Sequence, residues 1–160
     1  MNPAEENKQA RSAAIKHLVY RSRSESEIET HLSKKEFSDA AIASALQDLR
    51  ELGYLNDADL AFNWGRSKIE NRLWGPMRLK QGMLGRGLPK DVIRNAIALL
   101  YNEFNESELA HQAALKKLKS MDRLDRETQR RRLAPYLQRK GFSGDVVYET
   151  VQTLLPFRRE

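Results

Sequence analysis

Apolar residues recur every three or four positions along most of the chain, and short polar or capping segments separate these stretches. This spacing places the apolar side chains on one face of a helix. No stretch sustains the apolar and polar alternation of a half-buried strand. The pattern therefore predicts an all-α chain with helices over residues 9–21, 25–35, 39–52, 57–72, 76–86, 90–103, 106–121, 126–140 and 144–155.

Capping residues stand at several of these helix ends. Ser24 and Ser38 precede two of the helices, where a hydroxyl can accept a hydrogen bond from a free backbone N–H. Gly53, Gly87 and Gly141 follow three others, and glycine readily adopts the left-handed conformation that ends many helices. These residues predict where the chain leaves one helix and enters the next.

The same signals recur along the chain as an internal repeat. Phe37, Leu88 and Phe142 occupy equivalent positions, with offsets of 51 and 54 residues. Before each lies an apolar pair four residues apart: Ile28/Leu32, Leu79/Met83 and Leu133/Leu137. Such units bury their apolar faces internally and against their neighbours. The sequence predicts three tandem three-helix units, similar to helix-turn-helix units, in an elongated, curved array over residues 9–55, 56–104 and 105–155, with a flexible N-terminus (1–8) and a C-terminal tail (156–160).

Positive charge is concentrated after the first unit. The chain has 28 Lys and Arg against 22 Asp and Glu, a net charge of +6. Residues 1–55 carry 8 basic against 9 acidic side chains, residues 56–103 carry 8 against 5, and residues 104–160 carry 12 against 8. A polyanion or an acidic protein surface is a plausible partner for the basic part. Ordinary solubility charge is the alternative.

The segment 71–93 combines these cations with four of the eight glycines and two of the five prolines. One hypothesis is that Gly82 and Gly85, beside Arg78 and Arg86, remove side-chain bulk so that a partner's backbone or phosphates can approach. The alternative is that these glycines let neighbouring helices pack closely.

The central run resembles the signature of the RecX family, the bacterial regulators of the RecA recombinase. The resemblance rests on Gly53-Tyr54-Leu55-Asn56-Asp57, Leu60-Ala61-Phe62, Trp74-Gly75-Pro76 and Arg86-Gly87-Leu88, and on the ending LQRKGFSGDVV of the third repeat. Leu73 departs from the pattern, because the family often has glycine there. Pro135 lies inside a predicted helix and is expected to kink or shorten it.

The resemblance implies a regulator of homologous recombination, DNA repair and the SOS response. It would bind the RecA filament on single-stranded DNA, and duplex DNA more weakly, and would mainly inhibit filament extension, ATP hydrolysis and strand exchange. Separately from the resemblance, we expect a cytoplasmic location and a monomer. Basic residues with one aromatic are the candidate contacts: Arg66, Lys68, Arg72, Trp74, Arg78, Lys80, Arg86, Lys116, Lys117, Lys119, Arg130, Arg132, Arg139 and Lys140. Arg132, Tyr136, Arg139 and Lys140 are expected to form one stripe, whereas Arg130, Arg131 and Arg132 cannot all share a helix face.

No catalytic, metal-binding or cofactor-binding motif is recognisable. The chain has no cysteine, and His17, His31 and His111 lie far apart in the sequence, as expected of surface or boundary residues. No apolar stretch is long enough to span a membrane. We therefore expect a protein that is not an enzyme. Two other functions stay open: an autonomous helix-turn-helix-like DNA-binding protein, and a helical scaffold for an acidic protein.

Overall fold

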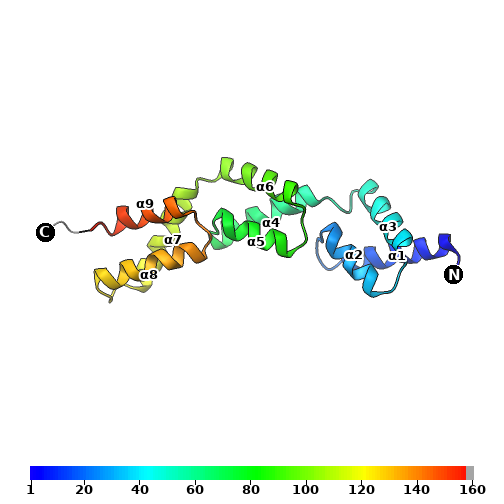
Figure 1. Cartoon of the computed structure of the whole chain (residues 1–160), viewed down its shortest axis with the longest axis horizontal. Helices are drawn as coiled ribbons and strands as arrows, with labels where there is room; N and C mark the ends of the chain where they lie inside the picture. The colour runs from blue at the N-terminus through cyan, green and yellow to red at the C-terminus, as the bar shows by residue number, and fades with distance from the viewer. Residues whose placement is uncertain (158–160) are drawn as a thin grey trace. The chain divides into compact units, whose positions relative to one another are not determined.

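The computed structural model describes residues 1–157, which form nine helices and no strand (Figure 1). The helices are α1 (Pro3–Leu18), α2 (Glu25–Lys34), α3 (Asp39–Glu51), α4 (Asp57–Arg72), α5 (Pro76–Gly85), α6 (Lys90–Glu103), α7 (Glu106–Ser120), α8 (Arg126–Arg139) and α9 (Gly144–Leu154). The predicted all-α class is confirmed. Apart from α1, each helix begins at the predicted residue and ends no more than one residue early. The predicted tail, residues 156–160, lies partly outside the described residues.

Helix α1 begins at Pro3, so most of the N-terminus that was predicted to be flexible is helical. The Asn2 side chain accepts a hydrogen bond of 2.9 Å from the backbone N–H of Ala4. Proline is well suited to a first helical turn, where its missing N–H costs no hydrogen bond. Glu5 and Glu6 also lie in the first turn, next to the positive end of the helix dipole.

The predicted capping residues mostly act as expected. Ser24 forms a capping box with Glu27, and the Ser38 hydroxyl accepts a hydrogen bond from the backbone of α3. Gly53, Gly87 and Gly141 all have positive φ, at 77°, 74° and 96°. The first unit places Glu36, with φ 66°, where the later repeats have glycine.

Proline does not shorten α8 as the sequence led us to expect. Pro135 lies inside this helix, which continues to Arg139. Leu73 has φ 53°, a left-handed conformation that favours glycine. This conformation explains why glycine would suit the position that Leu73 occupies.

The helices pack into two compact units. The first unit comprises residues 1–61 and 83–93, and the second comprises residues 62–82 and 94–160. In the first unit, alanines of α1 pack against larger aliphatic side chains of α2 and α3. Its buried core contains Ala10, Ala14, Ile28, Leu32, Ala41, Ile42, Ala45, Leu46, Leu49 and Leu55.

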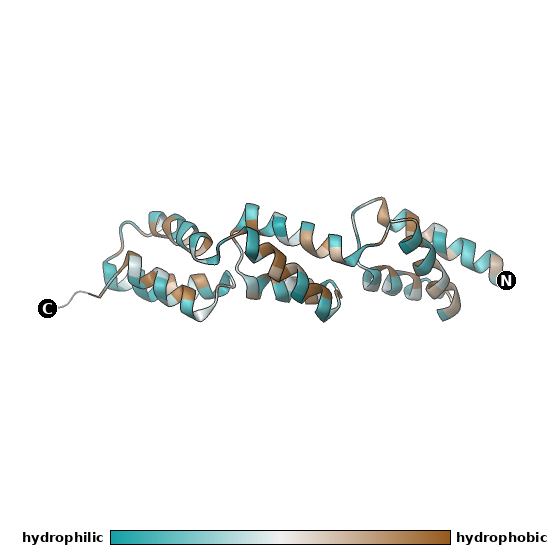
Figure 2. Ribbon diagram, turned by 90° about the horizontal axis from the view of Figure 1, so that it is seen from above, coloured by the Kyte–Doolittle hydropathy of each residue, from teal (hydrophilic) through white to brown (hydrophobic). Residues whose placement is uncertain are grey.

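The second unit builds its core from α7, α8 and α9 together with parts of α4, α5 and α6. Its buried apolar residues include Ile69, Leu79, Leu100, Leu109, Ala110, Ala113, Leu133, Leu137, Phe142, Val147 and Val151. Figure 2 shows hydrophobic and hydrophilic positions alternating around the helices, as the sequence pattern predicts. All three predicted apolar pairs of the repeat are buried. None of the described helices is long and apolar enough to cross a membrane.

Candidate nucleic-acid interface

Two turns of the second unit meet backbone to backbone. In the turn before α5, the N–H of Gly75 donates to the carbonyl of Lys140 at 2.7 Å, and the N–H of Met77 donates to the carbonyl of Gly141 at 3.0 Å. A Cβ on Gly75 would lie 2.4 Å from the carbonyl carbon of Gly141, and one on Gly141 would lie 2.4 Å from the backbone nitrogen of Arg78. Both positions therefore require glycine, and this junction fixes the cations that flank it.

The junction brings four cations together, which we call the basic cluster: Arg72, Arg78, Lys116 and Lys140. The Lys140 ammonium donates a 2.6 Å hydrogen bond to the carbonyl of Arg72, at the end of α4. Burial lowers the pKa of Lys140, and the positive charges of Arg78, Lys116 and Arg72 lower it further. The pKa of Lys140 thus reflects burial first and the neighbouring positive charges second.

Aromatic rings lie among these cations. The guanidinium of Arg78 lies 4.3 Å from the centre of the Trp74 ring, and the Lys68 ammonium lies 5.1 Å from it. The ammonium groups of Lys117 and Lys140 lie 5.0 and 5.7 Å from the centre of the Tyr136 ring. A cation over an aromatic face is attracted by the electron density of the ring. These contacts hold the cations together without neutralising their charge.

A half-buried tyrosine fixes the backbone of the Trp74 turn. The Tyr101 hydroxyl donates a 2.8 Å hydrogen bond to the carbonyl of Trp74. Burial, with a smaller contribution from Glu106, raises the pKa of Tyr101 well above its usual range. The hydroxyl therefore stays protonated and keeps donating throughout the physiological pH range.

Carboxylates neutralise other predicted residues but not the basic cluster. Arg66 forms ion pairs with Glu70 at 3.0 Å and with Glu103 at 3.1 Å. Among residues 1–157, no ion pair joins a carboxylate to any of Arg72, Arg78, Lys116 or Lys140, or to Lys68 or Lys117. The charge of this surface is therefore available to an anionic partner.

Two of the predicted contact residues have partners inside the chain instead. In the first unit, the Arg86 side chain is only 15% exposed and donates to the Glu27 carboxylate at 2.8 Å and to the Ser22 carbonyl at 2.9 Å. In the second unit, Arg130 donates to the carbonyl of Leu155, and its guanidinium lies over the Phe157 ring. Their charge and position predicted a partner contact, and both side chains have partners within the chain.

Close packing, the alternative reading, accounts for Gly82 better than room for a partner does. A Cβ on Gly82 would lie 2.3 Å from the far edge of the Trp64 ring. Trp64 in turn meets Trp74 edge to face, with 5.9 Å between the ring centres. A Cβ on Gly85 would meet no atom within 4 Å, so packing does not require glycine there.

A second basic region lies where α7 turns into α8. A hollow of about 610 Å³ is lined by Lys117, Ser120, Met121, Asp122, Arg123, Leu124, Arg131, Arg132, Pro135 and Arg139. Five of these side chains are cations and one is a carboxylate. Arg132 and Arg139 thus share a surface, whereas Tyr136 and Lys140, the other members of the predicted stripe, do not line this hollow. Sequence reasoning missed Arg123 and Arg131, because nothing in the pattern indicates which way a turn residue or the middle of three arginines points.

Three family models match the chain in tandem. They describe the first RecX three-helix domain over residues 10–49, the second over residues 56–97 and the third over residues 105–151. The chain belongs to the RecX family. The predicted fold of tandem three-helix repeats is confirmed with it.

RecX relatives resemble the chain in sequence and in fold. Regulatory protein RecX of Mycolicibacterium smegmatis is 31% identical over 99% of this chain and 86% of its own length. Regulatory protein RecX of Bacillus subtilis is 33% identical over 89% of this chain, which spans 54% of that relative, about half its length. The crystal structure of RecX from Lactobacillus salivarius matches with a TM-score of 0.84 over 94% of this chain and 97% of the other, at 22% identity, a likeness of fold.

Within the RecX fold, the predicted contact residues separate into groups. The second unit gathers Lys68, Arg72, Trp74, Arg78, Lys116, Lys117 and Lys140 around the glycine junction. Arg132 and Arg139 line the hollow, and Lys117 lines it as well. Lys80 and Lys119 are exposed and take part in neither group. Arg66 is ion-paired, and Arg86 and Arg130 are held by intrachain partners.

Proposed function

We propose that this RecX chain regulates the RecA recombinase by binding the filament that RecA forms on single-stranded DNA. In this proposal, the basic cluster of the second unit contacts the phosphates. The observation that carries it is that these four cations lie close together, with Arg78 and Lys140 over aromatic rings, and that none forms an ion pair with a described carboxylate. Holding like charges together costs stability, and such an arrangement is most easily explained by an anionic partner.

Phosphate binding relieves this repulsion. A phosphate placed among Arg72, Arg78 and Lys140 would favour the charged form of Lys140 and raise its lowered pKa. Contacts to phosphates carry no sequence information of their own. The expected binding is therefore strongly salt-dependent and indifferent to base sequence.

Regulation follows from occupancy of the filament. A chain bound to the DNA backbone and to the groove of the RecA filament would obstruct the addition of RecA subunits. It would also obstruct the pairing of a second DNA strand. We therefore propose inhibition of filament extension, ATP hydrolysis and strand exchange, and with it a role in recombination and DNA repair.

The test is a titration of DNA-stimulated ATP hydrolysis by RecA on single-stranded DNA. Inhibition at amounts well below one chain per RecA monomer is the expected result. No effect at equimolar amounts, with the chain shown to be helical by circular dichroism, contradicts the proposal. A discrete footprint on duplex DNA would then favour the helix-turn-helix alternative, and failure to bind single-stranded DNA at low salt would favour an acidic protein partner.

A further inference from the structure

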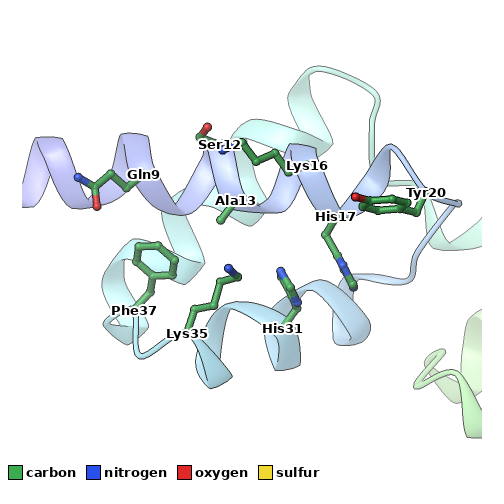
Figure 3. A pocket seen from close by; sticks show the side chains of 9 residues that line it. All are labelled: Gln9, Ser12, Ala13, Lys16, His17, Tyr20, His31, Lys35 and Phe37. Carbon is green, nitrogen blue, oxygen red and sulfur yellow. The ribbon is translucent and has the colours of Figure 1, made fainter.

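The first unit contains a hollow that the proposed function does not use. It has a volume of about 620 Å³ and lies between α1 and α2 (Figure 3). Its lining comprises Gln9, Ser12, Ala13, Lys16, His17, Tyr20, His31, Lys35 and Phe37. No carboxylate contributes to this lining, although the first unit carries 12 acidic against 10 basic side chains. A carboxylate-free hollow in an acidic unit indicates a site for an anion.

A stacked pair of histidines lies in the middle of the hollow. The rings of His17 from α1 and His31 from α2 are nearly parallel, at 3°, with 3.7 Å between their centres. Figure 3 shows Phe37, Lys35, His31, His17 and Tyr20 following one another along the hollow. The sequence led us to expect isolated histidines, because nothing in their spacing of fourteen residues indicates contact across two helices.

Burial and the surrounding positive charges both disfavour protonation of this pair. Burial lowers the pKa of His17, as do His31, Arg23 and Arg21, while Glu27 opposes them. Burial likewise lowers the pKa of His31, and the nearby Lys35, Arg23 and Lys34 act in the same direction. The Glu27 carboxylate is already bound to Arg86, at 2.8 Å. An anion in the hollow would reverse this balance and allow a histidine to take up a proton.

We propose that this hollow is a second binding site for single-stranded nucleic acid, in which Lys16, Lys35 and a protonated histidine hold a phosphate and Tyr20 stacks on a base. The ring of Tyr20 is 83% exposed, so it is free to meet a base. Aromatic rings lie at both ends of the hollow, with cations between them. This arrangement matches a nucleic-acid strand, in which bases and phosphates alternate, better than it matches an acidic peptide. Three or more carboxylate or imidazole groups suited to a metal do not gather anywhere in residues 1–157. The inference goes beyond the proposed function, because it assigns a nucleic-acid contact to the first unit, at residues that the basic cluster does not include.

The decisive experiment follows the imidazole signals of His17 and His31 by NMR across a pH titration of the full chain, with and without short oligo-dT. His17→Gln and His31→Gln variants assign the signals. We expect oligo-dT to raise the pKa of at least one of the two histidines and to bind more tightly as the pH falls, by about tenfold for each unit of that rise. Binding of oligo-dT that leaves both pKa values unchanged would overturn the inference, even if the chain inhibits RecA.

Variants separate the phosphate contact from the base contact. Lys16→Gln/Lys35→Gln should weaken oligo-dT binding about fivefold at low pH. The matched control Lys8→Gln/Lys90→Gln removes two exposed lysines of the same unit outside the hollow, and should leave affinity unchanged. Tyr20→Ala should weaken oligo-dT binding by about fivefold or more, whereas Tyr54→Ala, at another exposed tyrosine, should not. Equal losses in variant and control, or inorganic pyrophosphate raising the histidine pKa as effectively as oligo-dT, would contradict a nucleic-acid site.

Discussion

The two units of this chain share a helical repeat but use their charges in opposite ways. The first unit has 10 basic and 12 acidic side chains, and five of the seven ion pairs in the described residues lie within it. The second has 18 basic against 10 acidic side chains, and its basic cluster has no carboxylate partner among residues 1–157. Charge in the first unit mainly supports the fold, whereas in the second unit it is left for a partner.

Replacing the glycine at position 75, in the second unit, gives the largest expected effect. Gly75→Ala should lower the free energy of unfolding of the second unit by about 3 kcal/mol, because the new Cβ would collide with the backbone of Gly141. Both tryptophans lie in the second unit, so their fluorescence follows its denaturation. Gly144→Ala is the control in the same unit, with no atom near its Cβ. A Gly75→Ala variant as stable as this control would show that the junction is not tight.

Charge reversal in the basic cluster should come next. Arg72→Glu/Lys116→Glu should weaken binding to single-stranded DNA by about tenfold to a hundredfold and reduce the slope of log K against log salt by about two. Both side chains are exposed, so the fold should stay within about 1 kcal/mol of its original stability. Fluorescence anisotropy over a salt series measures both quantities. An unchanged salt slope would assign the DNA contact to another surface.

Removing an ion pair of the first unit should lower stability without weakening DNA binding. Glu27→Gln keeps an acceptor for the capping box but leaves the mostly buried Arg86 without its counter-charge, and should cost about 1–3 kcal/mol. Hydrogen exchange of residues 1–61 measures the loss, with the exposed Glu29→Gln as control. DNA binding at neutral pH should not change. A loss of DNA binding without a loss of stability would show that Arg86 is a contact residue after all.

The same glutamate predicts a pH dependence. Burial raises the pKa of Glu27, but hydrogen bonds from Ser24 and Arg86 and the charges of Arg86 and Arg21 outweigh it, so the net shift is downward. A carboxyl whose pKa is lower in the folded state contributes stability above its unfolded value of 4.5, and this contribution is lost as the pH falls through the folded pKa. Protection of the first unit should therefore fall below about pH 4.5 in the parent chain and fall less in Glu27→Gln.

The smallest effect compares two strained residues, one in each unit. Glu36 and Leu73 both have positive φ, which costs a residue with a side chain about 1 kcal/mol relative to glycine. Glu36→Gly should stabilise the first unit by about that amount, because its side chain is exposed. Leu73→Gly should gain less, because it also loses the contacts of a half-buried side chain. Denaturation curves of both variants decide the order, and a larger gain at Leu73 would contradict this reading.

Periodic features could be predicted from the sequence, and contacts between distant residues could not. The apolar pairs and the helix-ending glycines follow from local spacing and backbone preference, so the helices and the repeat were predictable. The pairing of Arg86 with Glu27 and the stacking of His17 on His31 depend on packing between helices. Arg86 was placed in the predicted interface by its charge alone, because its partner Glu27 lies 59 residues away in the sequence.

The most direct test of the central claim compares two charge-reversed variants in RecA ATP hydrolysis on single-stranded DNA. Arg72→Glu/Lys116→Glu changes the basic cluster, and Lys8→Glu/Lys90→Glu makes the same change of charge at exposed positions of the first unit. We predict that the first variant loses most of its inhibition at low ratios to RecA, while the second inhibits like the parent chain. Equal inhibition by the two variants, with both shown to be folded, would contradict the assignment of the interface to the second unit.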